Sequence, residues 1–227
     1  MSKYLIELNK IKKSYNHKNG SIEVFNNVNL RIKPGELIAL VGPSGSGKSS
    51  LLHILALLDK PTSGSIALFG KNSNNFSDEE KNKIRQKNIS IIFQDNNLLS
   101  DFTAIENILM PLLIRGENYK LAFNKAKKIL NDIKLSNRLN HFPSELSGGE
   151  QQRVAIGRSL IAQTNLILAD EPTGNLDFKT SKEIFSYFIK LKKMNRAIVY
   201  ATHNRELANK ADYKLSILNG VIKRVNG

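Results

Sequence analysis

The segment from Gly42 to Ser49 reads GPSGSGKS and constrains the fold more than any other part of the chain. It fits the pattern G-x-x-x-x-G-K-[ST], which is typical of a loop that wraps around the phosphates of a nucleotide. Apolar residues precede the loop at 37–41 and follow it at 50–58, which predicts a strand entering the loop and a helix leaving it. The alternative is a Gly- and Ser-rich turn that matches the pattern by chance.

The loop would bind phosphates mainly through its backbone. Its glycines lack the Cβ atoms that keep a ligand away from the chain, and the N-terminus of the following helix favours negative charge. Lys48 would reach the β- and γ-phosphates, and the Ser49 hydroxyl would be a ligand of Mg²⁺. We therefore predict a nucleoside triphosphate site that includes Gly42, Pro43, Ser44, Gly45, Ser46, Gly47, Lys48, Ser49 and Ser50.

The composition indicates the size of the fold and excludes several kinds of site and segment. The chain has 227 residues, which is enough for one domain with a sizeable core, and no cysteine, which excludes disulfides and thiolate metal sites. No apolar run approaches the ~18 residues of a membrane span, and the first ten residues lack the hydrophobic core of a signal peptide. We therefore expect any membrane role to depend on a partner.

The formal net charge of +14 first suggests binding to nucleic acid. The charge is spread along the chain, however. Only 9 of the 34 basic residues are arginines, the residue type that makes bidentate contacts with phosphates and bases. We therefore expect no dedicated nucleic-acid binding.

The apolar pattern predicts an α/β fold around a mainly parallel sheet. Apolar runs end near residues 41, 93, 169 and 200 and are separated by helical patterns, which is typical of strands buried on both faces of a sheet. Before the loop, short strand-like runs at 4–8, 10–15, 22–25 and 28–32, with a turn at 26–27, favour an N-terminal antiparallel β subdomain. A hairpin at 215–218 and 221–225 follows later in the chain.

Residues 96–162 read as helices without a strand, and we interpret them as a helical lobe inserted into a single domain, 1–227. The nucleotide-binding core is then 1–95 and 163–227. In the lobe, Thr103–Asn107 begins a helix that Pro111 interrupts, and further helices are predicted at 120–133 and 151–162. Elsewhere we predict a loop at 72–82, a short helix at 83–87 and an amphipathic helix at 181–193.

Polar side chains follow directly after the predicted strands, at Gln94, Asp170, Glu171 and His203. Ligands of parallel sheets lie at the carboxyl ends of the strands, so these side chains should face the same nucleotide as the loop. Asp170 suits the Mg²⁺ ion beside Ser49, and Glu171 can orient or deprotonate an attacking water. His203 can contact the γ-phosphate. The alternatives are a charge preference at a helix start for the acids and a structural role for the histidine.

The segment Leu146–Glu150, LSGGE, is a second candidate phosphate-binding element. Ser147 and Glu150 fit a capping box that starts a helix, yet the two intervening glycines are poor helix formers. Glycines at a helix N-terminus allow an anion to approach the backbone. We predict that a nucleotide, which could belong to a second subunit, is contacted by Ser147, Gly148, Gly149 and Glu150. Tyr15 is open to two interpretations, sheet packing or an aromatic face for a base.

Together these segments resemble the ATPase subunits of ABC transporters over nearly the whole chain. The most specific segment is LSGGEQQR at 146–153, and the matches also include the loop, Gln94, 168–171, 175–177 and His203. The resemblance implies ATP and Mg²⁺ as cofactors and Tyr15 stacked on adenine. The metal ligands would be Ser49, Gln94 and Asp170, and the catalytic residues Glu171, His203 and Gln94.

The same resemblance implies a homodimer in which two chains hold two ATP molecules head to tail. Each phosphate loop would then face the other subunit's 146–150 segment, and Asp177 would help to join the two sites. Gln94 would sense a membrane partner. The large apolar residues of the loop after it, Leu98, Leu99 and Phe102, are either buried under the helical lobe or exposed to that partner. The resemblance favours a docking groove lined by Leu98, Leu99, Phe102, Met110, Pro111 and Leu112.

A narrower resemblance lies in LLHILALLDKPTSG at 51–64, MPLLI at 110–114 and LADEPTGNLD at 168–177. These stretches are similar to LolD-type ATPases of the lipoprotein-releasing complex, a group close to MacB-type exporters. The similarity implies an ATPase that powers integral membrane permease subunits at the cytoplasmic face of the inner membrane and releases lipoproteins. Departures at Ala56, Leu57, Gly157 and Ser159 concern helix packing. The alternatives are the ATPase of another ABC transporter and a soluble ABC ATPase that acts on nucleic acid.

Overall fold

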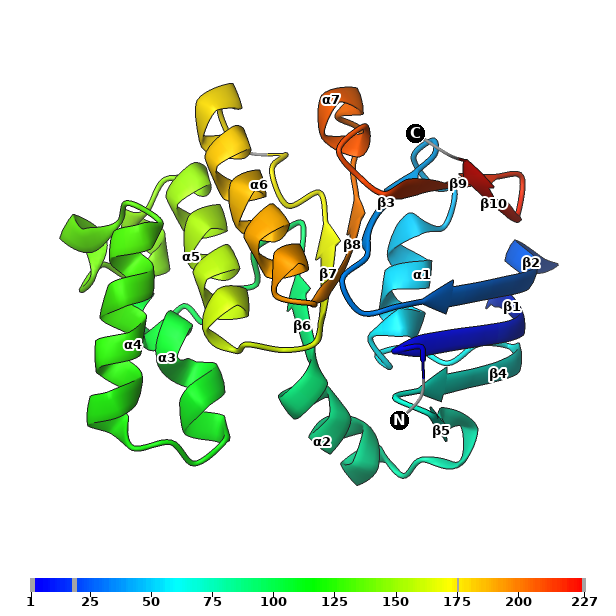
Figure 1. Cartoon of the computed structure of the whole chain (residues 1–227), viewed down its shortest axis with the longest axis horizontal. Coiled ribbons are helices and arrows are strands. Elements are labelled where there is room, and N and C mark those ends of the chain that lie inside the picture. The colour runs from blue at the N-terminus through cyan, green and yellow to red at the C-terminus, as the bar shows by residue number, and fades with distance from the viewer. Residues whose placement is uncertain (1–2, 18–19, 175, 226–227) are drawn as a thin grey trace.

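A six-stranded sheet in the order β10-β9-β3-β8-β7-β6 forms the centre of the molecule (Figure 1). The computed structural model describes residues 3–17, 20–174 and 176–225. Within this part of the chain, β9, β3, β8, β7 and β6 run parallel to one another and only β10 is antiparallel to its neighbour. The strands of this sheet are β3 (Leu37–Val41), β6 (Ile89–Ile92), β7 (Leu166–Asp170), β8 (Ala197–Ala201), β9 (Tyr213–Leu218) and β10 (Val221–Val225).

The inner strands β3, β7 and β8 are buried on both faces, which explains why they are almost continuously apolar. Along β3, Ile38 and Leu40 face one hydrophobic cluster, and Leu37 and Ala39 face another. The first cluster contains α1 (Lys48–Leu55), and the second contains residues from α6 (Phe178–Lys193) and α7 (Arg205–Ala208). The predicted α/β fold with a mainly parallel sheet is therefore confirmed.

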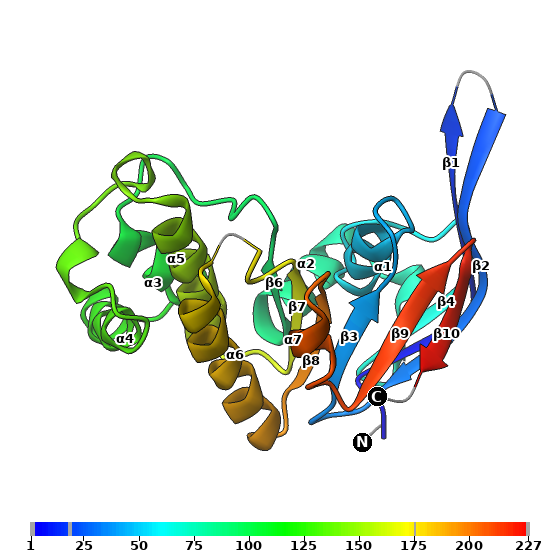
Figure 2. The ribbon, with the colours of Figure 1, turned by 90° about the horizontal axis from the view of Figure 1, so that it is seen from above.

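A second sheet, in the order β2-β1-β4-β5, covers the side of α1 that faces away from the central sheet (Figure 2). Its strands are antiparallel, as predicted: β1 (Ile6–His17), β2 (Gly20–Ile32), β4 (Ser63–Leu68) and β5 (Lys71–Asn72). The predicted turn at Asn26–Asn27 is wrong, because β2 is continuous and bulges there. Asn27 has a left-handed φ of 52°, and the extra residue lets Phe25 and Val28 both face the core.

Three helices form a lobe at the other end of the molecule (Figures 1 and 2). They are α3 (Ala104–Ile114), α4 (Tyr119–Asp132) and α5 (Gly148–Ile161), and they enclose a hydrophobic cluster of their own. Gly157 permits the close approach of α5, since a Cβ there would lie 2.9 Å from Ile108 Cδ1 and 3.0 Å from Ile133 Cδ1. The division of the chain at 95/96 and 162/163 stays a prediction.

Pro111 does not interrupt α3, and this prediction is wrong. Proline removes one backbone hydrogen bond and costs about 3 kcal/mol in a helix interior. On either side of it, Leu109 and Leu112 are buried in the lobe, and each buried leucine contributes about 1.5–3 kcal/mol. Burial of the two leucines therefore outweighs the defect at the proline.

Several element boundaries also differ from the predictions. The expected loop at 72–82 contains the 3₁₀ turn Ser73–Asn75 and the start of α2 (Asp78–Asn88), which is longer than the predicted 83–87. Ser77 and Glu80 form a capping box that explains this early start: Ser77 N donates to Glu80 Oε2 and Glu80 N donates to Ser77 Oγ. Two further 3₁₀ turns, Ser136–Arg138 and Pro143–Glu145, connect α4 to α5. Among the described residues, no helix has the length and apolar character of a membrane span.

Candidate functional site

The loop from Gly42 to Ser49 lies between the carboxyl end of β3 and the first turn of α1. Gly47 precedes the helix with φ 101°, and a Cβ at this position would lie 2.4 Å from Val24 Cγ1, so only glycine fits. The buried Lys48 folds back over the loop and donates from Nζ to the carbonyl oxygens of Gly42 and Pro43, at 2.9 Å each. An ammonium has three donors, so it can bind a phosphate and still hold the loop.

The residues that sequence reasoning placed at strand ends meet the loop in one cleft. Its volume is about 390 Å³, and it is lined by Tyr15, Val24, Ser44, Gly45, Gly47, Lys48, Ser49, Ser50, Gln94, Asp170, Glu171 and His203. Gln94 follows β6, Asp170 ends β7, and His203 follows β8. Neighbouring parallel strands bring their carboxyl ends to the same edge of the sheet, which explains how distant segments converge here. The loop residues Gly42, Pro43 and Ser46 do not line the cleft.

Glu171 is the most constrained acid in this cleft. Its φ of 45° lies in the left-handed region, which is costly for a residue with a side chain. Oε2 accepts a hydrogen bond from His203 N at 3.3 Å, and Oε1 lies 3.5 Å from His203 Nε2. Burial of the carboxyl raises the pKa of Glu171, and neighbouring Asp170 raises it further, against the opposing effects of His203 and Lys48. The geometry thus presents a carboxyl with an elevated proton affinity to the cleft.

The three residues predicted as ligands of a metal ion, Ser49, Gln94 and Asp170, all line the cleft. These are oxygen donors, which Mg²⁺ prefers, and Mg²⁺ is commonly held by one or two protein ligands together with substrate phosphates. No group of three or more His, Cys, Asp or Glu side chains that could enclose a metal occurs among the described residues. The donor set therefore fits a magnesium ion that accompanies a nucleotide.

The predicted second phosphate element lies apart from this cleft. The strands β6 and β7 lie between α5 and α1 in both views (Figures 1 and 2), and none of Ser147, Gly148, Gly149 and Glu150 lines the cleft. Ser147 and Gly148 are exposed at the start of α5, where a Cβ on Gly148 would meet no atom within 4 Å. The N-terminus of α5 is thus open to a ligand from outside this chain.

Glu150 fixes that N-terminus. Oε2 accepts from Ser147 N at 2.9 Å and Oε1 accepts from Arg138 Nε at 2.9 Å, while Glu150 N donates to Ser147 Oγ. The Arg138 guanidinium and the Ser147 N–H lower the pKa of Glu150 to about 2. Both carboxylate oxygens of Glu150 are therefore engaged in holding the turn. Arg138 was missed by sequence reasoning, because no local pattern links it to a residue twelve positions later.

The loop, the sheet order and the cleft define a phosphate-loop nucleotide-binding domain with an inserted helical lobe. The family model for the ABC transporter matches residues 25–174, and the chain belongs to this family. Membership makes it an ATP-binding ATPase domain, as its sequence resemblance predicted.

Relatives of known name match almost the whole chain. A lipoprotein-releasing system ATP-binding protein LolD from Rickettsia bellii is 49% identical, with 98% of this chain and 99% of that protein aligned. The protein of the same name from Legionella pneumophila (strain Lens) is 43% identical, with 97% of each chain aligned. Among solved structures, the ATP-binding cassette MJ0796, a dimer in a post-hydrolysis state bound to ADP and Pi, gives a TM-score of 0.93 at 36% identity. The match covers 97% of this chain and 98% of that one.

Proposed function

We propose that this chain is the ATP-hydrolysing subunit of a transporter that releases lipoproteins from the inner membrane. The observation that carries the ATPase activity is the convergence of the phosphate loop with Gln94, Asp170, Glu171 and His203 in one cleft. The lipoprotein-releasing role is supported by the names of relatives that align along the full length of the chain. The chain would act at the cytoplasmic face of the membrane, attached through its partner subunits.

In this proposal the cleft binds ATP with its phosphates on the loop. Lys48 pairs with the β- and γ-phosphates, and the α1 N-terminus adds favourable dipole charge. Ser49, Gln94 and Asp170 would hold Mg²⁺, which neutralises phosphate charge when bound. Glu171 accepts a proton from the attacking water, a role that suits a carboxyl with a raised pKa. His203, whose backbone N–H bonds Glu171, orients that carboxyl and faces the γ-phosphate.

We further propose that the active form is a head-to-tail homodimer. The start of α5 lies outside this chain's own cleft, and its exposed Ser147 and Gly148 suit the γ-phosphate bound by a second copy. The dimer reported for MJ0796 supports a dimeric state by analogy. Asp177 caps α6 by accepting from Thr180 N at 3.0 Å. It follows the acids Asp170 and Glu171 in the sequence and would join the two sites. The neighbouring Asn175 is outside the described residues.

The membrane partner would dock between the central sheet and the helical lobe. A groove of about 240 Å³ lies there and includes Ile91, Pro111 and Ile114. Arg85, Arg115 and Arg158 also line it, and each donates to backbone carbonyl oxygens, those of Leu57, Gln86 and Asn97. Within the described part of the chain no carboxylate forms a salt bridge with these three guanidinium groups, and only Arg85 is near enough to Asp78 to lower the pKa of that carboxyl. We infer that the groove suits an apolar segment with acidic residues.

The groove differs in detail from the one predicted. Leu112 is buried in the lobe and is therefore not available to a partner, whereas Leu98 is partly exposed and packs against the same cluster. Leu99 and Phe102 remain exposed, at 40% and 38%. The loop that carries them is held by Asn107, whose side chain bonds the N–H and carbonyl of Leu99.

Purification of the tagged chain from detergent extracts tests the proposed function. Integral membrane subunits should copurify with it, and the reconstituted complex should release a lipoprotein from proteoliposomes only when ATP is present. The complex with Glu171→Gln is the matched control and should assemble without release. A complex that hydrolyses ATP and exports another cargo, but releases no lipoprotein, would contradict the lipoprotein-releasing role.

A further inference from the structure

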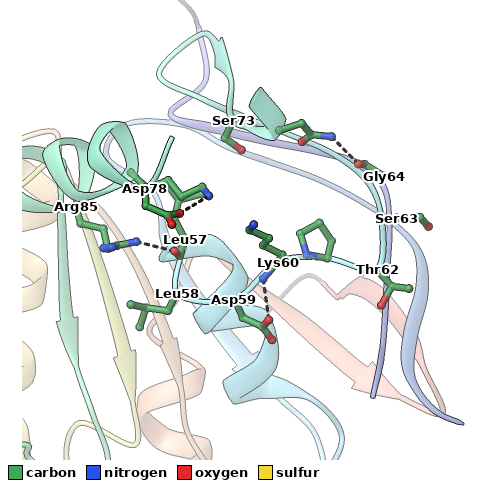
Figure 3. Close-up of a pocket in the computed structure, with 13 residues that line it drawn as sticks. Leu57, Leu58, Asp59, Lys60, Thr62, Ser63, Gly64, Ser73, Asp78 and Arg85 are labelled. Atoms are coloured by element: carbon green, nitrogen blue, oxygen red, sulfur yellow. Dashed lines mark hydrogen bonds and ion pairs between the residues drawn. The ribbon is translucent and has the colours of Figure 1, made fainter. Parts of the chain in front are cut away.

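An ion pair between Lys13 and Asp59 lies next to Tyr15, which lines the cleft. It was not predicted from the sequence. The Lys13 side chain is only 8% exposed. Its Nζ lies 2.7 Å from Asp59 Oδ2 and 2.8 Å from Oδ1, and it also donates to the carbonyl oxygen of Lys60 at 2.9 Å. Figure 3 shows Asp59 after the end of α1, beside a cavity of about 420 Å³, with the Lys60 N–H bonded to its carboxylate.

Both members of the pair also contact Tyr15. The Tyr15 hydroxyl donates to Asp59 Oδ2 at 3.0 Å, and the ammonium of Lys13 lies 4.4 Å from the centre of the Tyr15 ring. At these distances the first contact is a charge-assisted hydrogen bond and the second a cation–π interaction. The hydroxyl is also 3.3 Å from Ser50 Oγ, in the first turn of α1. One aromatic ring is thus fixed at its hydroxyl and at its face.

The Lys13–Asp59 ion pair is not needed merely to attach β1 to the segment after α1, because a second contact makes the same attachment. That attachment is also made by Thr62, whose N–H donates to the carbonyl of Lys12 at 2.8 Å and whose hydroxyl accepts from Ser14 N at 2.9 Å. Burial alone would raise the pKa of Asp59, but hydrogen bonds from Lys13 and Tyr15 outweigh it and lower the pKa below the usual aspartate value. Asp59 is therefore charged at neutral pH and accepts the hydrogen bond from the Tyr15 hydroxyl as a carboxylate.

We propose that Lys13 and Asp59 are positioning residues that hold the ring of Tyr15 against the base of the bound nucleotide. Tyr15 lines the cleft together with the phosphate loop, and an aromatic ring held in one orientation stacks on a base with less loss of entropy. The inference rests on the proposed ATP site. It adds that the affinity for the base depends on a charge pair that touches neither the base nor the phosphates.

The test compares two ligands, ATP and inorganic tripolyphosphate, which has the phosphates without the base. Calorimetric titration of the full chain should show that Lys13→Met and Asp59→Asn weaken ATP binding about 3–10-fold. This loss lies at or below the lower end of the range for removal of a whole stacking ring, because the Tyr15 ring itself is retained. Tripolyphosphate binding should change less than about 2-fold, because the phosphate loop is untouched. KM for ATP should rise in both variants while kcat stays near the wild-type value. Lys12→Met, on the same strand and paired with the exposed Glu23, is the matched control.

Tyr15→Ala and Tyr15→Phe separate the inference from the proposed site. Unchanged ATP affinity in Tyr15→Ala would mean that the ring does not stack, and the base site itself would be wrong. If Tyr15→Ala weakens ATP binding but Lys13→Met and Asp59→Asn do not, only the positioning role is overturned. Equal losses for ATP and tripolyphosphate in Lys13→Met would also overturn it, because the pair would then act on the loop or on folding. Tyr15→Phe retains the ring and loses the hydroxyl. It should lose less ATP affinity than Tyr15→Ala and should bind tripolyphosphate as the wild type does.

Discussion

At the scale of single residues, the backbone of Glu171 is the feature most directly tied to function. A non-glycine residue with a φ of 45° is strained, and the hydrogen bond from Glu171 N to the Ala201 carbonyl, at 3.1 Å, holds it there. The consequence is a carboxyl that leaves the end of β7 and enters the cleft instead of bonding its own backbone. Asp170, one residue earlier, continues the strand, so the two acids take different positions.

Glu171→Gln should stop hydrolysis while sparing ATP binding. The amide has the shape of the carboxyl but cannot accept the proton, and loss of a general base typically lowers the rate ~10²–10⁴-fold. Steady-state phosphate release and calorimetric titration with ATP measure the two effects. Glu206→Gln, at an exposed position of α7, is the control and should retain wild-type turnover. Persistent hydrolysis by Glu171→Gln would show that another group is the base.

The same substitution should remove the contribution of this site to the pH dependence of stability. Burial raises the folded-state pKa of Glu171 above 4.5, so the folded protein binds the proton more tightly than the unfolded chain does. The resulting stability is fully present below pH ~4.5 and is lost as pH rises through the folded pKa. Thermal unfolding of Glu171→Gln should therefore occur at a higher temperature than that of wild type at pH 8, with a smaller difference at pH 4. A pH-independent difference would contradict the raised pKa.

At the scale of elements, the start of α5 depends on the carboxyl of Glu150, whose pKa is lowered, whereas the pKa of Glu171 is raised. Glu150 closes the capping box of α5 and pairs with Arg138. This links the helix to the 3₁₀ turn at Ser136–Arg138 and fixes the exposed backbone of Ser147 and Gly148. A mobile N-terminus could not present its N–H groups to a phosphate in a defined geometry.

Glu150→Gln should destabilise the protein at neutral pH and lose that effect in acid. The folded pKa is lowered from 4.5 to about 2, so the carboxylate contributes stability above pH ~4.5 that disappears as pH falls toward the folded pKa. We expect the variant to unfold about 2–6 °C below wild type at pH 7, with the gap closing toward pH 3. Thermal scans monitored by circular dichroism measure it. A difference in unfolding temperature that widens in acid would contradict the lowered pKa of Glu150.

The sequence predicted elements whose signals are local. The strand before the loop at 42–49, the helix after it and the location of the polar residues at strand ends agree with the prediction. Each of these features depends on a short pattern or on the geometry of parallel sheets. The start of α2 could also have been predicted, because Ser77 and Glu80 match the sequence pattern of the capping box that they form.

Other features depend on contacts that the sequence does not encode locally. The bulge at Asn27 depends on pairing with β1, and the helix through Pro111 depends on burial in the lobe. Lys13 and Asp59 are 46 positions apart, so their relation to Tyr15 appears only when β1 and the end of α1 are side by side. The roles of the site residues stay predictions until the variants are measured.

At the scale of the whole molecule, α5 connects the two halves. Ile156 of α5 belongs to the hydrophobic cluster under the central sheet, whereas Val154 and Ile161 belong to the lobe. The cleft and the N-terminus of α5 are therefore carried by one packed structure but are not assembled into one site. A second copy, related by a two-fold axis, can complete each cleft with the other chain's helix.

Mixing two inactive variants tests this completion directly. Lys48→Ala removes the charge that faces the phosphates, and Ser147→Arg blocks the start of α5; each variant alone should hydrolyse almost no ATP. A mixed head-to-tail dimer contains one site with both defects and one intact site. An equal mixture should therefore recover about a quarter of the wild-type rate, because about half of the dimers are mixed and each has one of two sites. A mixture no more active than its separate components would contradict the account.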